Sequence, residues 1–408
     1  MKILFITPRL PHAHAYSGMQ MVYQKMSRLI ARGHEVGLIC HIDPDLDGAY
    51  MGEVNPELQD MEIIKDPFLN RVLPSSFSYG KYASPSSFFR YHSSSMNQQI
   101  GETVARGRYD VVIAEFTAMG QYLHRNPFLP AVRKIISCHD SPTLGSRRRM
   151  DFMEASLKWG KQWLEYRHMR QMEFQLYRSM DRVLTLTDQE RFDLLEEDST
   201  LGITTVRPGI SSKMFKPIAD LPKEYCIIIT ARFSSDQSQY GCLWFLRTVW
   251  PILRGQDPNV KLYLVGRDPS AAMKRQAKRD DRIFITGGVQ DLRPFLAKSK
   301  IYVCPILSGS GVRGKILEAM AMNLPVVSTS VGAEGIPVDQ GSNAFIADSP
   351  EVMSGYISML LQDQDKANLM GNLGRNSVEK YFNWDDSVDR LEQVLHEVVS
   401  KRSYHQVA

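Results

Sequence analysis

An alternation of β-rich runs with helix-length segments occurs twice along the chain and constrains the fold most strongly. The first block has such runs at Lys2–Thr7, Val36–Cys40, Met61–Ile64, Tyr109–Ala114, Val132–Cys138, Arg182–Thr187 and Ile203–Val206. The second block has them at Tyr225–Ala231, Val260–Gly266, Arg282–Thr286, Lys300–Pro305 and Pro325–Ser328. Strands that alternate with helices form parallel sheets with helices on both faces. The pattern predicts an α/β chain of two doubly wound, Rossmann-like domains.

The boundary between the two blocks is predicted near residue 208. A stretch rich in Pro, Gly, Ser and Lys interrupts the alternation at Pro208–Pro222, and a chain of 408 residues is long enough for two cores. We therefore expect an N-terminal domain at 1–208 and a C-terminal domain at 209–384. Residues 385–408 should form a helix and tail that return to the N-terminal domain, because apolar residues follow a helical spacing in Ser387–Ser400.

Composition excludes several classes of function. The net charge is only +4, from 49 basic and 45 acidic residues, which gives no reason to expect a nucleic-acid partner. No run of 18 apolar residues is present, and the apolar start of the chain is interpreted as a strand rather than a signal peptide. The five cysteines form no CxxC pair, so buried free thiols in a reducing compartment are expected, with neither metal nor disulfide. The predicted location is cytoplasmic.

Residues 43–108 are less regular than the rest of the first block and are rich in Ser, Tyr, Phe and Pro. Long irregular segments in compact domains are often functional. Acceptor recognition and ordinary surface packing are both open for this segment.

The segment Pro305–Glu318 carries the clearest chemical signal. A buried strand is expected to end there, Gly309, Gly311 and Gly314 let backbone approach a ligand, and a helix follows. Helix starts at the carboxyl ends of parallel strands attract anions, and Arg313 and Lys315 add positive charge. The spacing matches neither GxGxxG nor GxxxxGK[ST], which argues against a nicotinamide dehydrogenase or a P-loop ATPase. The segment therefore predicts a diphosphate site, the alternative being a glycine-rich surface turn.

The residues after this loop resemble a known family. Glu318–Thr329 reads Glu-Ala-Met-Ala-Met-Asn-Leu-Pro-Val-Val-Ser-Thr and is followed by Gly332-Ala-Glu-Gly335. This is similar to the donor-site signature of retaining glycosyltransferases with the GT-B fold, family 4 type. Further segments stand in the order that the family has: Ser17-Gly18, Gly33–Val36, Arg207–Ile210 with Phe215–Pro217, and Trp384. The resemblance implies two domains that face each other across a cleft, with the acceptor side N-terminal and the nucleotide-sugar donor side C-terminal.

The resemblance also implies roles for residues of the second domain. Glu318 would accept hydrogen bonds from the two ribose hydroxyls, and Gly311, Val312 and Arg313 would offer backbone N–H groups to the diphosphate and sugar. Arg232 matches the family's arginine that neutralises the departing nucleotide. Val289 would contact the base through its backbone.

In the first domain the resemblance points to two positions. His139, in Ser137-Cys-His-Asp140 at a predicted strand end, would contact the transferred sugar, and Gly18 would line the donor site. A structural histidine is the alternative for His139. The predicted catalytic residues are thus His139, Arg232 and Glu318.

Two departures from the family pattern concern the donor. Ser310 stands where many members have a glutamate that contacts a sugar hydroxyl, which leaves the donor sugar undecided. After Arg232, the sequence through Gly241 lacks the lysine with which many members hold the diphosphate. Arg313 or Lys315 is predicted to supply that charge.

The implied activity is a hexosyltransferase that uses a UDP- or GDP-sugar and retains the anomeric configuration, without metal or other cofactor. Its acceptor would be a glycan, a lipid-linked sugar or a small molecule, in glycan, polysaccharide or glycoconjugate synthesis. A non-catalytic sugar-nucleotide-binding protein is one alternative, which Ser310 and the missing lysine favour. A nucleotide-sugar epimerase of the same fold is another, although no cluster of acid and base residues is recognisable for it.

Basic and apolar residues mix in Ser146–Met150 and in the helical stretch that includes Trp159, Trp163 and Tyr166. Such a face could contact the inner membrane surface, where a lipid-linked acceptor would lie. A helix packed on its own domain, with arginines at the cleft, is the simpler interpretation.

Overall fold

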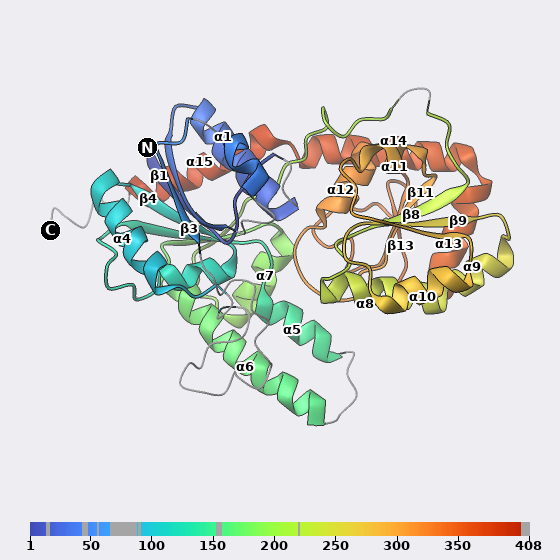
Figure 1. Ribbon diagram of the computed structural model, residues 1–408, viewed down its shortest axis with the longest axis horizontal. Coiled ribbons are helices and arrows are strands. Elements are labelled where there is room, and N and C mark those ends of the chain that lie inside the picture. The colour runs from blue at the N-terminus through green and yellow to red at the C-terminus, as the bar shows by residue number, and fades with distance from the viewer. Residues whose placement is uncertain are drawn as a thin grey trace. The chain divides into compact units, whose positions relative to one another are not determined.

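The computed structural model describes residues 1–13, 17–42, 48–54, 57–65, 88, 91–151, 157–218 and 221–400. It divides the chain into two compact units (Figure 1). The first unit comprises Met1–Arg207 and the chain from Asp385 onward, and the second comprises Pro208–Trp384.

The first unit contains a seven-stranded parallel sheet with the order β3-β2-β1-β4-β5-β6-β7 in its described residues. Its strands are β1 (Lys2–Thr7), β2 (Glu35–Ile42), β3 (Asp60–Lys65), β4 (Val111–Glu115), β5 (Arg133–Cys138), β6 (Arg182–Thr185) and β7 (Ile203–Thr205). Its helices are α1 (Ser17–Ala31), α4 (Ser94–Gly107), α5 (Pro142–Asp151), α6 (Leu157–Arg178), α7 (Asp188–Glu197) and α15 (Trp384–Ser400), with short 3-10 helices η1 (Gly48–Glu53) and η3 (Thr117–Tyr122).

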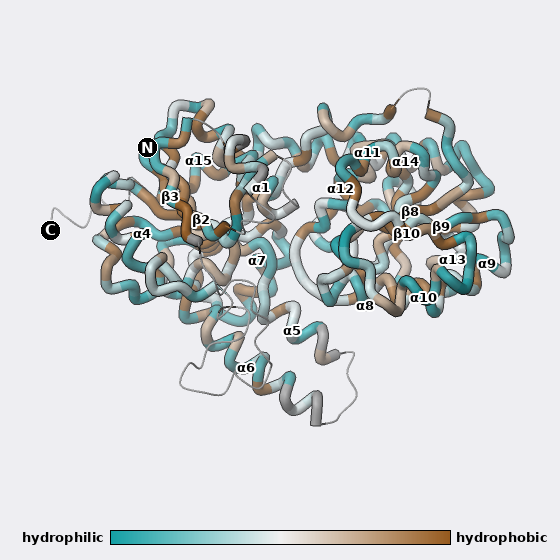
Figure 2. Tube along the Cα trace, in the orientation of Figure 1, coloured by the Kyte–Doolittle hydropathy of each residue, from teal (hydrophilic) through white to brown (hydrophobic). Residues whose placement is uncertain are grey.

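Strand β1 shows why the sheet is buried on both faces. Ile3 and Phe5 pack into one core cluster, with residues of α1 and α15, whereas Leu4 and Ile6 pack into the other. Successive side chains of a strand point to opposite faces, so a continuous apolar run requires cover on both sides. Figure 2 shows the hydrophobic colour concentrated along β2, the neighbour of β1.

The final helix, α15, packs on the first unit. Its apolar residues join the core cluster of β1, β2 and α1; they are Val388, Leu391, Val394, Leu395 and Val398. Arg32, at the end of α1, forms an ion pair with Asp389 at 2.6 Å and a second one with Glu392. The apolar face that the sequence shows in Ser387–Ser400 is therefore the face that α15 buries.

The second unit contains a six-stranded parallel sheet with the order β10-β9-β8-β11-β12-β13 in its described residues. Its strands are β8 (Cys226–Thr230), β9 (Lys261–Val265), β10 (Ile283–Gly287), β11 (Ile301–Cys304), β12 (Val326–Ser328) and β13 (Phe345–Ile346). Its helices are α8 (Asp236–Trp244), the π-helical η4 (Phe245–Val249), α9 (Trp250–Gln256), α10 (Ala271–Arg279), α11 (Arg293–Lys298), α12 (Gly314–Ala321), α13 (Pro350–Gln362) and α14 (Gln364–Tyr381).

These sheets confirm the predicted α/β class with two doubly wound, Rossmann-like sheets. All twelve predicted strands are present within a few residues of their predicted ends, and β13 is an addition. With only two residues, Phe345 and Ile346, β13 is too short to give a periodic signal.

Each sheet has a point where the order of the strands reverses. In the first unit β1 lies beside β4, and in the second β8 lies beside β11. The loops that leave neighbouring strands at such a point run to opposite faces and open a crevice at the carboxyl ends, where ligands of α/β proteins bind. We therefore expect the candidate site residues at these two edges.

Other expectations meet the structure only in part. Within residues 43–108 it describes η1, β3 and α4, but residues 66–87 and 89–90 lie outside the described residues, so acceptor recognition there stays a prediction. All five cysteines are buried and free. No described helix combines the length and the hydrophobicity needed to cross a bilayer.

Candidate active site

His139 follows the last residue of β5 and contacts Glu115, the last residue of the neighbouring strand β4. The His139 Nε2 atom lies 2.6 Å from the Glu115 Oε2 atom, and the two side chains are 5% and 1% exposed. Adjacent parallel strands end at the same edge of a sheet, which brings these two residues together although 24 positions separate them.

Lys25 of α1 reaches the same carboxylate. Its Nζ atom lies 3.0 and 3.2 Å from the two oxygens of Glu115 and donates a third hydrogen bond to Ser137 Oγ at 3.2 Å. Burial alone raises the pKa of Glu115, but the Lys25 ammonium and the hydrogen bond with His139 outweigh it and lower the pKa to about 2. Glu115 is therefore a buried carboxylate that stays ionised because it has two partners.

Phe116 and Gly18 enclose the other side of the imidazole. The Phe116 ring stacks on His139 at 4.0 Å between centroids, and its backbone adopts a φ of 72°. A Cβ atom on Gly18, in the first turn of α1, would lie 2.7 Å from the Phe116 ring and 3.9 Å from His139 Nδ1. Gly18 therefore allows α1 to approach the Phe116 ring closely, and a larger residue at this position would displace that ring.

Buried polar groups hold the chain on both sides of His139. Tyr177 of α6 donates a hydrogen bond to Glu173 at 2.7 Å and contacts Cys138 Sγ at 3.1 Å, while Glu173 accepts one from the Thr143 backbone N–H at 2.9 Å. Burial, with the nearby carboxylates of Glu190 and Glu173, raises the pKa of the Cys138 thiol well above its ordinary value. Cys138 is therefore an unreactive structural thiol rather than a nucleophile.

In the second unit, the glycine-rich loop lies between β11 and α12, at the reversal of the strand order. Gly309 and Gly311 have φ values of 111° and 85°, which favour glycine strongly. Gln237, in the first turn of α8, lies beside Gly309, because a Cβ atom there would be 2.5 Å from its amide. The loop thus places the backbone of Gly309 and Gly311, both buried, between the starts of two helices, α8 and α12.

Glu318 lies on α12 and is 3% exposed. Lys315 contacts both of its carboxylate oxygens at 3.0 Å. The Arg313 guanidinium donates hydrogen bonds to the backbone carbonyls of Ser310 and Gly311, the latter at 3.1 Å. Lys315 is thus bound to the carboxylate and Arg313 to the loop, and the predicted contact of either cation with a diphosphate stays a prediction.

Arg232 follows β8, the central strand at the same edge. Its side chain is 55% exposed and donates a hydrogen bond to Ser234 at 3.0 Å, with Asp268 at 3.7 Å. Val289 follows β10 in the same sheet and is half-buried. Arg232, Val289 and the loop from Ser310 to Glu318 therefore all lie beyond the carboxyl ends of β8, β10 and β11.

The structure brings the predicted residues together within each unit. Gly18 and His139 are neighbours in the first unit, and Ser310, Gly311, Val312, Arg313, Lys315 and Glu318 form one loop and helix start in the second. The sequence did not reveal Lys25, Glu115 or Gln237. Glu115 directly follows the predicted strand Tyr109–Ala114, so its place at a strand end could have drawn attention to it. Lys25 lies within an otherwise ordinary amphipathic helix and gives no such signal.

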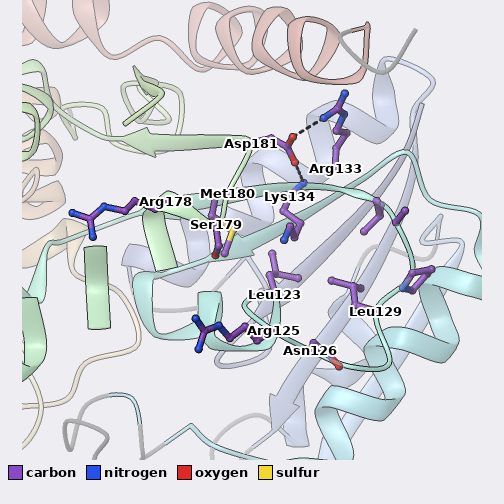
Figure 3. Close-up of a pocket in the computed structure, with 13 residues that line it drawn as sticks. Leu123, Arg125, Asn126, Leu129, Arg133, Lys134, Arg178, Ser179, Met180 and Asp181 are labelled. Carbon is purple, nitrogen blue, oxygen red and sulfur yellow. Dashed lines mark hydrogen bonds and ion pairs between the residues drawn. The ribbon is translucent and has the colours of Figure 1, made fainter. Parts of the chain in front are cut away.

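A separate hollow of about 690 Å³ lies at the opposite edge of the first sheet (Figure 3). It surrounds the amino-terminal ends of β5 and β6, where Asp181 binds Arg133 at 2.7 Å and the Lys134 backbone N–H at 2.7 Å. None of the predicted site residues lines it. Among the described residues, no cluster of three or more His, Cys, Asp or Glu side chains is suited to a metal ion.

Comparison with known sequences relates the chain to proteins of sugar transfer. Residues 224–363 match the family described as glycosyl transferases group 1. An uncharacterized 44.6 kDa protein in the cps region of Klebsiella pneumoniae is 20% identical over 87% of this chain and 90% of its own length. A GDP-mannose-dependent alpha-(1-6)-phosphatidylinositol monomannoside mannosyltransferase of Mycobacterium tuberculosis is 26% identical over 46% of this chain and 54% of its own length.

Solved structures share the fold over nearly the whole chain. Sucrose-phosphate synthase from Thermosynechococcus elongatus superposes with a TM-score of 0.75 at 18% identity and covers 98% of this chain and 100% of its own. Anabaena HepE in complex with UDP-glucose gives 0.71 at 14% identity and covers 97% and 100%. The fold is therefore GT-B, and together with the matched domain it identifies the chain as a glycosyltransferase.

Proposed function

We propose that this glycosyltransferase moves a hexose from a UDP- or GDP-sugar to a glycan, lipid-linked or small-molecule acceptor, with retention of the anomeric configuration. The reaction would belong to glycan, polysaccharide or glycoconjugate synthesis. The relatives support both nucleotides, because one is named for its dependence on GDP-mannose and one structure contains UDP-glucose.

The observation that carries the proposal is the arrangement around the glycine-rich loop of the second unit. The buried backbone of Gly309 and Gly311 lies between the starts of α8 and α12, and the nearly buried Glu318 lies on α12. Backbone N–H groups at helix starts bind phosphates, and a fixed carboxylate binds a pair of ribose hydroxyls. A nucleoside diphosphate has both phosphates, which the loop would bind, and ribose hydroxyls, which Glu318 would bind.

The proposed chemistry is leaving-group stabilisation. When the bond between sugar and diphosphate breaks, negative charge grows on the diphosphate and positive charge grows on the sugar ring. Arg232 is more than half exposed at the edge of the site and can turn from Ser234 and Asp268 toward a phosphate. Fixed cations and backbone dipoles of this kind supply several kcal/mol of transition-state stabilisation, and the proposal involves no metal or other cofactor.

His139 is proposed to contact the transferred sugar, and Ser310 to contact it through a hydroxyl without adding charge. The proposed retention of configuration is supported by the resemblance of residues 307–335 to the family 4 signature.

Nucleotide release with product analysis tests the proposal. The protein is incubated with UDP-glucose, GDP-mannose and ADP-glucose, with and without acceptor extracts, after a thermal-shift screen with the matching nucleoside diphosphates. We expect one nucleotide to raise Tm and acceptor-dependent release of that nucleotide, with the anomeric configuration preserved in the product by NMR. An inverted product would contradict retention, and an epimerised donor without transfer would contradict the reaction class.

Contact with the cytoplasmic membrane surface is proposed for the case of a lipid-linked acceptor. The structure limits which residues could provide it, because Arg147 and Arg170 pair with Glu197 of α7 and Arg148 pairs with Asp193. These arginines pair within their own unit, which favours the simpler interpretation of a packed helix. Sedimentation with anionic vesicles at low salt decides between the two, and absence of binding would remove the membrane proposal.

A further inference from the structure

The charged groups beneath His139 balance one another. Lys25 and Glu115 form a buried ion pair at 3.0 Å, with side chains 3% and 1% exposed. His139 is the further side chain that contacts the Glu115 carboxylate within the described part of the chain. With the ammonium and the carboxylate in place, the pair carries no net charge. A second proton on the imidazole would therefore add an unbalanced charge to a buried cluster.

The contacts of the ring also fix where its single proton lies. Nε2 is 2.6 Å from an ionised carboxylate, which accepts hydrogen bonds only, so Nε2 must carry a hydrogen. Nδ1 faces Gly18 in the first turn of α1, where the positive end of the helix dipole opposes a proton. A neutral imidazole held this way offers a lone pair at Nδ1.

We propose that Lys25 and Glu115 are positioning residues that keep the His139 proton on Nε2 and so preserve Nδ1 as a hydrogen-bond acceptor for a hydroxyl group of the bound sugar. This inference rests on the proposed contact between His139 and the sugar. Glu115 fixes the tautomer, the Phe116 ring fixes the plane, and Lys25 keeps the carboxylate from drawing a second proton onto the ring.

The charged side chains near the ring come from several elements. Glu115 ends β4, Lys25 lies on α1, and Asp140 follows His139 in the chain. Glu173 of α6 and Glu190 of α7 act on Cys138, the residue before His139. Among the charged side chains of the described residues, Lys25 and Glu115 are the two in the hydrogen-bonded group that includes Nε2, so changes to these two should alter the ring selectively.

Two readouts test the proposal, and the first needs no substrate. Nitrogen-15 NMR of histidine-labelled protein reports the tautomer and titration of each of the ten histidines, and the signal lost in His139→Asn assigns His139. We expect the Nε2–H form in the native protein. In Glu115→Gln part of the signal should change to the Nδ1–H form, because a glutamine amide can also donate a hydrogen bond to Nε2, and in Lys25→Met the carboxylate loses the partner that holds it in place. The double variant Lys25→Met/Glu115→Gln removes both charges and is measured beside them, since either single change leaves a buried partner uncompensated.

The second readout is nucleotide release from UDP-glucose or GDP-mannose as a function of pH. Turnover should fall about tenfold in Lys25→Met and in Glu115→Gln, in step with the loss of the Nε2–H form. His139→Asn should retain at least tenfold more turnover than His139→Gln, because the asparagine amide falls near the position of Nδ1 and the glutamine amide near Nε2.

The outcomes separate the two proposals. An Nδ1–H form in the native protein, or an unchanged tautomer in both Lys25→Met and Glu115→Gln, overturns the positioning role even if transfer is observed. Full turnover in His139→Ala instead overturns the proposed sugar contact. The NMR result stands independently of which donor the enzyme uses.

Discussion

The two units each carry a Lys–Glu ion pair at the carboxyl edge of their sheet, and the two pairs differ in burial. Lys25 and Glu115 are 3.0 Å apart with side chains 3% and 1% exposed, and 90 positions separate them. Lys315 and Glu318 are also 3.0 Å apart, but Lys315 is 37% exposed and the residues are three positions apart on one helix.

This difference indicates two ways of preparing a carboxylate for function. Glu115 is locked by tertiary contacts with α1 and β5, so it can only orient its neighbour. Glu318 is covered by one long side chain that can turn into solvent, so a ligand can share or replace that contact. The first carboxylate is therefore suited to positioning and the second to binding.

The largest effect, on the free energy of unfolding, is expected from breaking the buried ion pair of Lys25 and Glu115. Lys25→Met should lower the free energy of unfolding by about 3–5 kcal/mol, because Glu115 loses the partner that compensates its buried charge. Lys315→Met is the matched control and should change it by less than about 0.5 kcal/mol. Urea unfolding of both variants measures the contrast, and equal losses would show that the two pairs do not differ as burial indicates.

Removing Arg232, the cation proposed to stabilise the leaving diphosphate, should strongly affect turnover. Arg232→Ala should lower the rate of nucleotide release by about 10²–10³-fold, because the leaving diphosphate loses its stabilising charge. Arg254→Ala, which removes an arginine of α9 that is paired with Asp280, should leave the rate unchanged. Steady-state release assays compare them, and a normal rate for Arg232→Ala would exclude it from the mechanism.

Acid should weaken the buried pair in a defined range. The pKa of Glu115 falls from an ordinary 4.5 to about 2 in the folded protein, so its contribution is complete above about pH 4.5 and is lost as the pH falls toward 2. The native protein should lose about 3 kcal/mol from this group across that range. Unfolding curves of the native protein and Lys25→Met/Glu115→Gln test this, and a double variant with the same acid dependence would disprove it.

The exposed pair should matter for ligand affinity. Glu318→Gln should weaken binding of UDP or GDP about 10–100-fold, through loss of charge-assisted hydrogen bonds to the ribose. Lys315→Met should change the affinity less than about threefold if the lysine merely covers the carboxylate. Isothermal titration calorimetry gives both values. A greater loss in Lys315→Met than in Glu318→Gln would instead support the predicted contact between Lys315 and the diphosphate.

The smallest effect that we expect is a gain in affinity for the nucleoside diphosphate. Gln237 lies beside Gly309, so Gln237→Lys would add a cation at the loop where the sequence lacks the lysine of related enzymes. It should tighten binding of the nucleoside diphosphate about threefold, the size of an exposed charge contact, and Gln237→Glu should weaken it. The same titrations apply, and identical affinities would place Gln237 away from the diphosphate.

The second unit's site was predictable because its chemistry is continuous in the sequence. Gly309, Gly311 and Glu318 follow one strand within a single stretch, and backbone conformation and helix start are local properties. The role predicted for Arg313 and Lys315 stays a prediction. Their contacts with the loop carbonyls and with Glu318 could not be predicted, because they depend on side-chain placement rather than on spacing.

The sequence by itself determined the strand and helix pattern, the two sheets and the glycine-rich loop, because periodicity and glycine preference act over a few residues. Only the tertiary structure decided that Lys25, Glu115 and His139 form one buried group. These residues lie on α1, β4 and the end of β5, and they meet because strands β1, β4 and β5 are neighbours in the sheet. The order of strands in a sheet depends on long-range packing, and no local pattern in the sequence records it.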